Sequence, residues 1–406
     1  MKKNFVINSL TTFICLIPIS LMIGAAVSEF FVSLTALLFL IYTLIYRDWF
    51  YYKKKIFIIL IIFFVYIVSL SLLSEFPVNS LSSSIFYFRF YLMFLAIWFL
   101  LDNNKNFPKY FALSIAAPLL LAFFYSLPDL YKSIRFESMK HDYRISGVFG
   151  TELVQGSYFL RFLILFVGVY TLINSNFKNK FGYYFIFFSS IFIILVSGER
   201  ASIGLLFIFL FLFLFFSEIK ILYKVKIFFL IIFIIIISVM YLPGLKNRVF
   251  DNTKNLVYEN GSIKAFSRGH QEHYTSALKM FKKNIITGVG VRNFRLECRK
   301  NEYRYIGVNS CTTHPHNTYV QFLAETGVVG FLFIISLFFY ISKFLMSNFF
   351  KIISGKKIFN SANMFSIAIF INIFPLVPTG NFFNNWLSAI YFLPLAFFFY
   401  SLEKEK

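Results

Sequence analysis

All five histidines of the chain fall in two segments between long apolar runs. They are His141 in the first segment and His270, His273, His314 and His316 in the second. A neutral imidazole accepts a proton near neutral pH, which suits histidine to general base catalysis. His316 follows Pro315 and precedes Asn317, a residue type that caps helices, and a long apolar run comes next. We therefore expect His316 at the entrance of a membrane helix, and interpret His141, His270 and His273 as solvated loop residues.

Arginines suited to phosphate binding occur near the same segments. Arg200 lies in a short turn between two apolar runs, and Arg268 stands two residues before His270. A guanidinium group stays charged and binds phosphate oxygens through two parallel hydrogen bonds. Three further arginines extend this set as a candidate cationic funnel: Arg89, Arg144 and Arg161. Charge inside a membrane is costly, so Arg89 and Arg161 are functional candidates, with snorkelling to the headgroups as the equal alternative.

The spacing of the histidines gives little support to a metal site. His270-x-x-His273 and His314-x-His316 offer imidazoles, but no carboxylate ligand set accompanies them and no His-Glu-x-x-His helix is present. We expect chemistry without a metal or other cofactor.

Two of the cysteines, Cys298 and Cys311, lie in the second histidine segment, whereas Cys15 lies in the first apolar run. Disulfides persist in extracytoplasmic compartments. A Cys298–Cys311 bridge is therefore a hypothesis, and two free thiols are the alternative.

Composition places these residues in a membrane protein. The chain is 59% hydrophobic and 14% charged, whereas soluble chains carry about 25% charged residues. Its net charge of +21 would suit a nucleic-acid partner. Lys and Arg fall mostly in short clusters between apolar runs, however, which is typical of membrane proteins. We therefore expect membrane lipid and no nucleic acid as the partner.

Twelve apolar runs approach the roughly 20 residues that a membrane-spanning helix needs. They cover residues 9–27, 29–46, 56–74, 84–101, 110–127, 156–173, 181–197, 201–217, 225–242, 318–343, 362–378 and 385–401. We interpret the first run as an uncleaved span rather than a signal peptide. The fold class predicted is an all-α polytopic membrane protein, with residues 1–406 as one integral domain.

Charge in the connecting segments predicts the orientation. Lys and Arg recur in alternate connections, whereas the short segments 75–83 and 378–384 contain neither. The positive-inside rule then places both termini in the cytoplasm. The long segments 128–155 and 243–317 fall outside, where we expect the chemistry. In the second, Tyr274, Ala277, Leu278 and Phe281 have helical spacing, which predicts an amphipathic helix on the membrane.

The stretch that begins at His316 resembles the O-antigen ligase family. That family's pattern is His, then Asn, Ser or Gln, nine residues, Gly, two residues and Gly, and His316, Asn317, Gly327 and Gly330 occupy its fixed positions. We expect the two glycines to let another helix approach closely. The turn at Arg200 and the stretch that Arg268 begins resemble two further segments of the family. The resemblance covers roughly residues 140–335.

This resemblance implies a metal-independent glycosyltransferase in the bacterial inner membrane. A ligase moves a glycan from undecaprenyl pyrophosphate to a lipid A-core acceptor at the periplasmic face. His316 is then the general base, and Arg200 and Arg268 bind the donor pyrophosphate. The main alternative is an O-antigen polymerase, whose acceptor is a second lipid-linked glycan.

Two less favoured alternatives are a protein O-glycan transferase and a transporter. The sequence offers a transporter little support, because only Asn372, Pro375 and Pro378 hint at a broken helix. We interpret them as ordinary irregularity near the end of a span.

Overall fold

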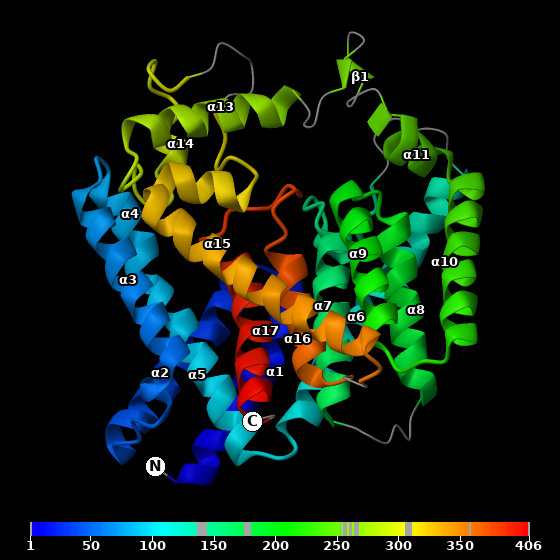
Figure 1. Cartoon of the computed structure of the whole chain (residues 1–406), viewed down its shortest axis with the longest axis horizontal. Helices are drawn as coiled ribbons and strands as arrows, with labels where there is room; N and C mark the ends of the chain where they lie inside the picture. Colours follow the sequence, from blue (N-terminus) through cyan, green and yellow to red (C-terminus); the bar gives the residue numbers. More distant parts are fainter. Residues whose placement is uncertain are drawn as a thin grey trace.

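The computed structural model describes residues 2–135, 144–173, 180–251, 253–254, 258–259, 262–263, 268–304, 311–356 and 359–404. Within these ranges the chain is a bundle of helices (Figure 1). The strands in this described part are β1 (Tyr258–Glu259) and β2 (Ser262–Ile263), which form a small antiparallel pair. The predicted all-α class is confirmed.

The first six long helical stretches follow one another closely along the chain. They are α1 (Lys3–Ile23), α2 (Ala25–Tyr46), α3 (Lys55–Leu73), α4 (Pro77–Ser84), α5 (Phe88–Asn103) and α6 (Phe107–Arg135). Short 3-10 turns, η1 (Tyr51–Lys53) and η2 (Ile85–Tyr87), precede α3 and α5.

The remaining helices lie before, within and after the second histidine segment, residues 243–317. Before it come the 3-10 turn η4 (Gly147–Phe149), α7 (Gln155–Ile173), α8 (Lys180–Val196), α9 (Arg200–Phe216) and α10 (Ile221–Tyr241). Within it are α11 (Pro243–Lys246), the π turn η5 (Asn247–Asp251), α13 (Arg268–Lys283) and α14 (Phe294–Glu297). After it come α15 (Thr318–Ile353), α16 (Ser361–Asn372) and α17 (Asn385–Lys404).

Helix length and hydropathy support a multi-pass membrane protein. In the described part of the chain, nine helices are long and apolar enough to cross a membrane. Three shorter apolar helices, Phe181–Val196, Arg200–Phe216 and Ser361–Asn372, coincide with further predicted spans. Each of the twelve apolar runs therefore lies at least partly on a helix, while the number of crossings stays a prediction.

Two helix ends differ from those expected. Helix α6 continues to Arg135, beyond the expected end of its span at residue 127. Helix α16 ends early, at Asn372, because the following prolines lack a backbone N–H group and their rings clash with the preceding turn. The rest of the expected span 362–378 is an irregular segment, which contributes to the site described below.

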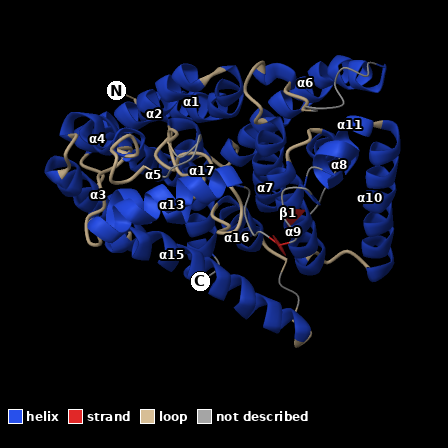
Figure 2. Cartoon of the chain, turned by 90° about the horizontal axis from the view of Figure 1, so that it is seen from above, coloured by secondary structure: helices blue, strands red, loops and turns tan. Residues whose placement is uncertain are grey.

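Aromatic side chains fill the centre of the bundle. Tyr91, Phe94 and Tyr158 are fully buried, and α16 packs against both α7 and α17. Helix α10 stands at the edge (Figure 2), where Phe229 keeps 63% of its surface exposed. Exposed apolar side chains on such a helix are expected where lipid is the solvent.

Helix α13 lies across one end of the bundle and packs against α15, and both chain termini lie at the opposite end (Figure 1). The helix predicted within 243–317 is confirmed, with one difference in its faces. Tyr274 and Ala277 are buried, but Leu278 is exposed. The buried side chains of this helix also include polar ones, such as Ser276 and Glu272, so they do not form an unbroken apolar stripe.

Candidate functional site

Four histidines converge between α13 and the start of α15; we call them the histidine cluster (His270, His273, His314 and His316). The ring centroid of His316 lies 4.1 Å from that of His314, 5.4 Å from that of His273 and 5.9 Å from that of His270. His270 and His273 share one face of α13 because they are three residues apart. The interpretation of these two as solvated loop residues was wrong. His141 lies outside the described residues.

The backbone around His316 is held from two sides. His316 adopts a left-handed φ of 58°, and its carbonyl oxygen accepts a hydrogen bond from Thr379 N at 3.0 Å. The Asn317 side chain accepts hydrogen bonds from Tyr319 N and Val320 N, which confirms the predicted helix cap. Its amide also donates to Pro375 O at 2.8 Å. Such contacts are what a non-glycine residue needs to persist in a left-handed conformation.

Burial and neighbouring imidazoles set the protonation of His316. They lower the pKa of His316 to about 3. Burial is also the main cause that lowers the pKa of His314 to about 4. A histidine with a lowered pKa is neutral at neutral pH. His316 can therefore accept a proton and release it readily.

Glu199 fixes the turn that carries Arg200. Its carboxylate accepts hydrogen bonds from Gly156 N at 2.6 Å and Ser157 N at 3.0 Å, at the amino end of α7. The turn is also bound by Arg248, whose Nε donates to Gly198 O at 3.0 Å. A carboxylate is favourable at a helix amino end, where backbone N–H groups lack partners.

Arg200 itself is half-buried and close to the histidine cluster. Its charge helps to lower the pKa of His270, after burial and His273. Its Nη1 donates a long hydrogen bond to Thr253 Oγ1 at 3.4 Å, and no carboxylate pairs with Arg200 among the described residues. Arg144 is exposed and near enough to repel it. These two guanidinium groups therefore offer positive charge to an anion.

The other predicted arginines differ in their surroundings. Arg89 donates to Glu29 Oε1 at 2.8 Å and to Asn385 Oδ1 at 2.7 Å, so its charge is balanced within the bundle. Arg161 donates to Ser157 and lies within electrostatic range of Glu199 and Tyr391. Arg268 begins α13, but its side chain is outside the described part of the structure.

The sequence interpretation missed two further arginines, one near the histidine cluster and one beside that arginine. Arg292 and Arg295, just before and within α14, are half-buried. Arg292 Nη1 donates to Ser83 Oγ at 3.1 Å, and the charge of Arg295 acts on His314. These two arginines are three residues apart in the second histidine segment, and this pairing of cations close to the histidines could have identified them.

The irregular segment after α16 was missed as well. His314 Nε2 lies 3.2 Å from Thr379 O, and Pro375 O accepts from Asn317. The helix break at Asn372 therefore frees backbone groups that hold His314 and His316. The sequence interpretation expected irregularity near the end of this span and did not assign the segment a part in the site.

We expected Gly327 and Gly330 to let another helix approach closely. In the part of the chain that the structure describes, neither glycine contacts another helix in this way. Gly327 has a φ of 63° and kinks α15, and a Cβ there would collide with the Ile286 carbonyl. The partner is the turn after α13: Val328 N donates to Ile285 O at 2.8 Å. A Cβ at Gly330 would meet the Thr326 side chain of the same helix.

Cys298 and Cys311 form a disulfide in this structure, with Cα atoms 5.2 Å apart. Cys298 is fully buried in a small apolar core that includes Ala277, Phe294 and Ala324. The pair joins the end of α14 to the segment that leads to His314. Its oxidation in the cell stays a prediction.

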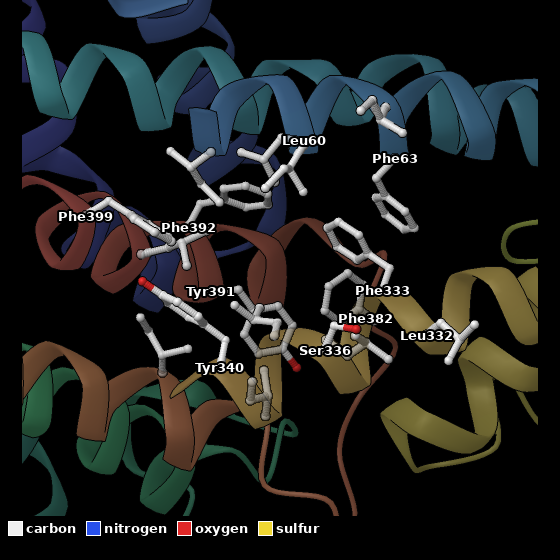
Figure 3. A pocket seen from close by; sticks show the side chains of 18 of the residues that line it. Leu60, Phe63, Leu332, Phe333, Ser336, Tyr340, Phe382, Tyr391, Phe392 and Phe399 are labelled. Carbon is white, nitrogen blue, oxygen red and sulfur yellow. The ribbon is translucent and has the colours of Figure 1, made fainter. Parts of the chain in front are cut away.

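An apolar cavity of about 640 Å³ lies between α3, α15 and α17 (Figure 3). Phe333, Phe382 and Phe392 are among the aromatic residues that line it. One wall residue, Tyr391, is next to Thr318 at the start of α15. The cavity therefore reaches from the apolar interior toward the histidine cluster.

Within the described residues, no group of three or more His, Cys, Asp or Glu side chains could hold a metal ion. Metal-independent chemistry stays a prediction.

The fold and the site together define a polytopic helical membrane protein with histidines and arginines gathered at one end of its bundle. Residues 185–335 match the model of a family described as O-antigen ligase, which confirms the resemblance seen in the sequence. The match includes Arg200, Arg268 and His316. It supports a glycosyltransferase of the ligase or polymerase type and a multi-pass inner-membrane setting. No curated protein matches the chain.

Proposed function

We propose that the protein is an O-antigen ligase-like glycosyltransferase of the bacterial inner membrane. It transfers a glycan from undecaprenyl pyrophosphate to a lipid A-core acceptor at the periplasmic face, with both termini in the cytoplasm. The observation that carries the proposal is a partly buried, neutral His316 in a cluster whose member His270 lies near Arg200, a guanidinium group that lacks a carboxylate partner among the described residues.

The reaction needs one proton acceptor and one stabilised leaving group. His316 takes the proton of the acceptor hydroxyl as its oxygen bonds to the anomeric carbon of the donor. The bond from that carbon to the pyrophosphate oxygen breaks, and the electron pair stays on the pyrophosphate. Arg200 and Arg268 stabilise the negative charge that develops there, with Arg144 nearby.

The apolar cavity supports a lipid-linked substrate. Its lining is almost entirely hydrocarbon and aromatic, and Tyr391 brings one end close to Thr318, two residues after His316. A polyprenyl chain can occupy such a space while its pyrophosphate reaches the arginines.

An O-antigen polymerase is the second candidate, because the family match supports both activities. The two differ in the acceptor, which is a lipid A core for a ligase and a second lipid-linked glycan for a polymerase.

The test is glycan transfer by the purified protein in lipid vesicles. Lipid-linked donor is offered with either lipid A core or a second lipid-linked glycan, and the lipid that gains sugars identifies the activity. The control is His316→Ala, which we expect to insert normally and to lose about 10²–10⁴-fold in rate. Transfer to neither lipid by the wild type, or near-normal transfer by His316→Ala, would overturn the proposal.

A further inference from the structure

Positive charge stands on two sides of the histidine cluster. Arg200 acts on His270, and Arg295 acts on His314. Both histidines contact His316, with ring centroids at 5.9 Å and 4.1 Å. His316 therefore lies in a cluster that has Arg200 near one member, His270, and Arg295 near another, His314. Arg200 begins α9 and Arg295 lies in α14, helices that stand well apart in the bundle (Figure 1).

Each of the two charged groups contains a pair of arginines close enough to repel each other. The cation that acts on Arg200 is Arg144, whereas the cation that acts on Arg292 is Arg295. The second group, which we call the Arg292–Arg295 pair, comes from the segment between α13 and α14 and from α14 itself. Two cationic groups on different helices, each near a different histidine of one cluster, fit two anions better than one.

The Arg292–Arg295 pair is held rigidly. The Asn79 amide of α4 donates to Arg292 O at 3.2 Å. Phe294 N donates to the buried Glu325 Oε1 of α15 at 3.3 Å. Arg292 has a left-handed φ of 58°, a conformation that only Arg47 and His316 share among the non-glycine residues described. A cation placed with such restraint is prepared for a ligand.

Arg295 lacks an anionic partner in the part of the chain that the structure describes. It is half-buried, its Nε is buried without a hydrogen-bond acceptor, and no carboxylate forms an ion pair with it. Arg292 differs, because Glu325 and Glu29 attract it. Burial of an unpaired charge is costly unless a ligand balances it. The guanidinium of Arg295 is thus available to an anion that reaches the histidine cluster from the side of α14.

We propose that the Arg292–Arg295 pair is a second anion subsite, which binds a phosphate group of the acceptor lipid while the Arg200 side binds the donor pyrophosphate. This inference rests on the proposed function, because a transferase that joins two lipid-anchored substrates must orient both at one base. The phosphate belongs either to a phosphorylated lipid A core or to a second lipid-linked glycan. The subsite brings the acceptor hydroxyl to His316 from the face opposite the leaving group.

Steady-state transfer in vesicles with Arg295→Gln tests the subsite. We expect the KM for the acceptor to rise about 10- to 100-fold, the loss typical of one hydrogen bond to a charged group, with the KM for the donor unchanged. Arg200→Gln should instead raise the KM for the donor and leave the KM for the acceptor unchanged. Arg299→Gln is the matched control, because Arg299 is exposed and close by in the same segment, and it should change neither constant.

A second measurement compares phosphorylated with dephosphorylated acceptor for each variant. This ratio does not change when part of the protein is unfolded. Wild type should prefer the phosphorylated acceptor by the same factor, Arg295→Gln should show no preference, and Arg295→Lys should recover part of it. The acceptor class that shows the preference identifies the source of the phosphate. An unchanged acceptor KM, an increased donor KM or a preference retained by Arg295→Gln would overturn the subsite alone. Absence of transfer by the wild type to both lipids would overturn the proposed function as well.

Discussion

The chemistry of His316 depends on its surroundings more than on its residue type. Burial and three neighbouring imidazoles favour its neutral form. An ordinary solvated histidine, with a pKa near 6.5, would be mostly protonated at pH 5 and unable to act as a base. His316 should remain a base in mildly acidic conditions.

We predict that kcat/KM falls on the acid side only well below pH 6.5. A lowered pKa preserves the neutral base as the pH decreases, and activity disappears when the pH passes down through that lowered value. Initial rates at subsaturating donor, measured between about pH 4.5 and 8, the range in which an ordinary histidine base titrates, should therefore stay nearly constant. The residual rate of His316→Ala over the same range reports titration of the substrate. Half-maximal activity near pH 6.5 that is absent from this control would contradict the prediction.

Asn317 offers a second prediction for a single residue. Asn317→Ala removes the acceptor for Tyr319 N and Val320 N and the donor to Pro375 O. Loss of such a cap typically costs about 1 kcal/mol, so thermal unfolding in detergent should begin at lower temperature. Asn317→Asp keeps the cap but loses the donor to Pro375 O, so it should recover only part of the lost stability. Equal melting of Asn317→Ala and wild type would show that the cap is unimportant.

At this scale the sequence predicted a residue's role where that role depends on the residue type and on adjacent residues in the chain. It indicated His316, Arg200 and the Asn317 cap as site residues. It could not show that His270, His273 and Arg295 join them, because that depends on how α13 and α14 pack against α15.

At the scale of elements, the site depends on two interrupted helices. Helix α15 kinks at Gly327, and α16 ends at Asn372. Apolar run length predicted that these helices exist but not where they break. Proline chemistry explains the second break, whereas the first follows from a tertiary contact with the turn after α13, which local propensity does not contain.

Gly327→Ala should destabilise the protein by roughly 1–3 kcal/mol, because its backbone conformation (φ 63°, ψ −166°) is nearly exclusive to glycine. The new Cβ would also collide with the carbonyl of Ile286. The matched control is Gly204→Ala in α9, where a Cβ meets open space. Thermal unfolding and transfer rate should both decrease for the first variant and remain unchanged for the second. Equal behaviour of the two variants would mean that the kink is not required.

The disulfide is a further prediction about an element. Alkylation of the unfolded, non-reduced protein should modify Cys15 alone, and reduction should expose Cys298 and Cys311 to the reagent. A bridge over this separation of 13 residues contributes roughly 3 kcal/mol in the chain-entropy account. Three modified cysteines before reduction, counted by intact mass, would exclude the bridge.

At the scale of the whole molecule, the chain is polarised along the bundle. The histidine cluster and α13 lie at one end and both termini at the other (Figure 1). The Lys and Arg clusters and the apolar runs predicted this arrangement. Apolar runs identify the spans, and Lys and Arg clusters identify the cytoplasmic connections. The position of α13 over the site was not predictable, since its buried face is largely small and polar.

We predict that both termini lie in the cytoplasm and α14 in the periplasm. Green fluorescent protein fused to the C-terminus should fluoresce, because it folds on the cytoplasmic side. Alkaline phosphatase fused after Lys300 should be active, because it requires export. The reverse pattern in cells would invert the topology and remove the lipid-linked donor from reach of the site.

The contact between the turn after α13 and the kink in α15 is made by main-chain atoms. Val328 N bonds to Ile285 O, Val289 N to Ala324 O and Gly290 N to Glu325 O. Main-chain bonds do not depend on which side chains are present. Substitutions along most of both stretches should therefore preserve this contact, provided that glycine remains where the two backbones meet. A pattern with few fixed positions can in this way still specify how the candidate site is arranged.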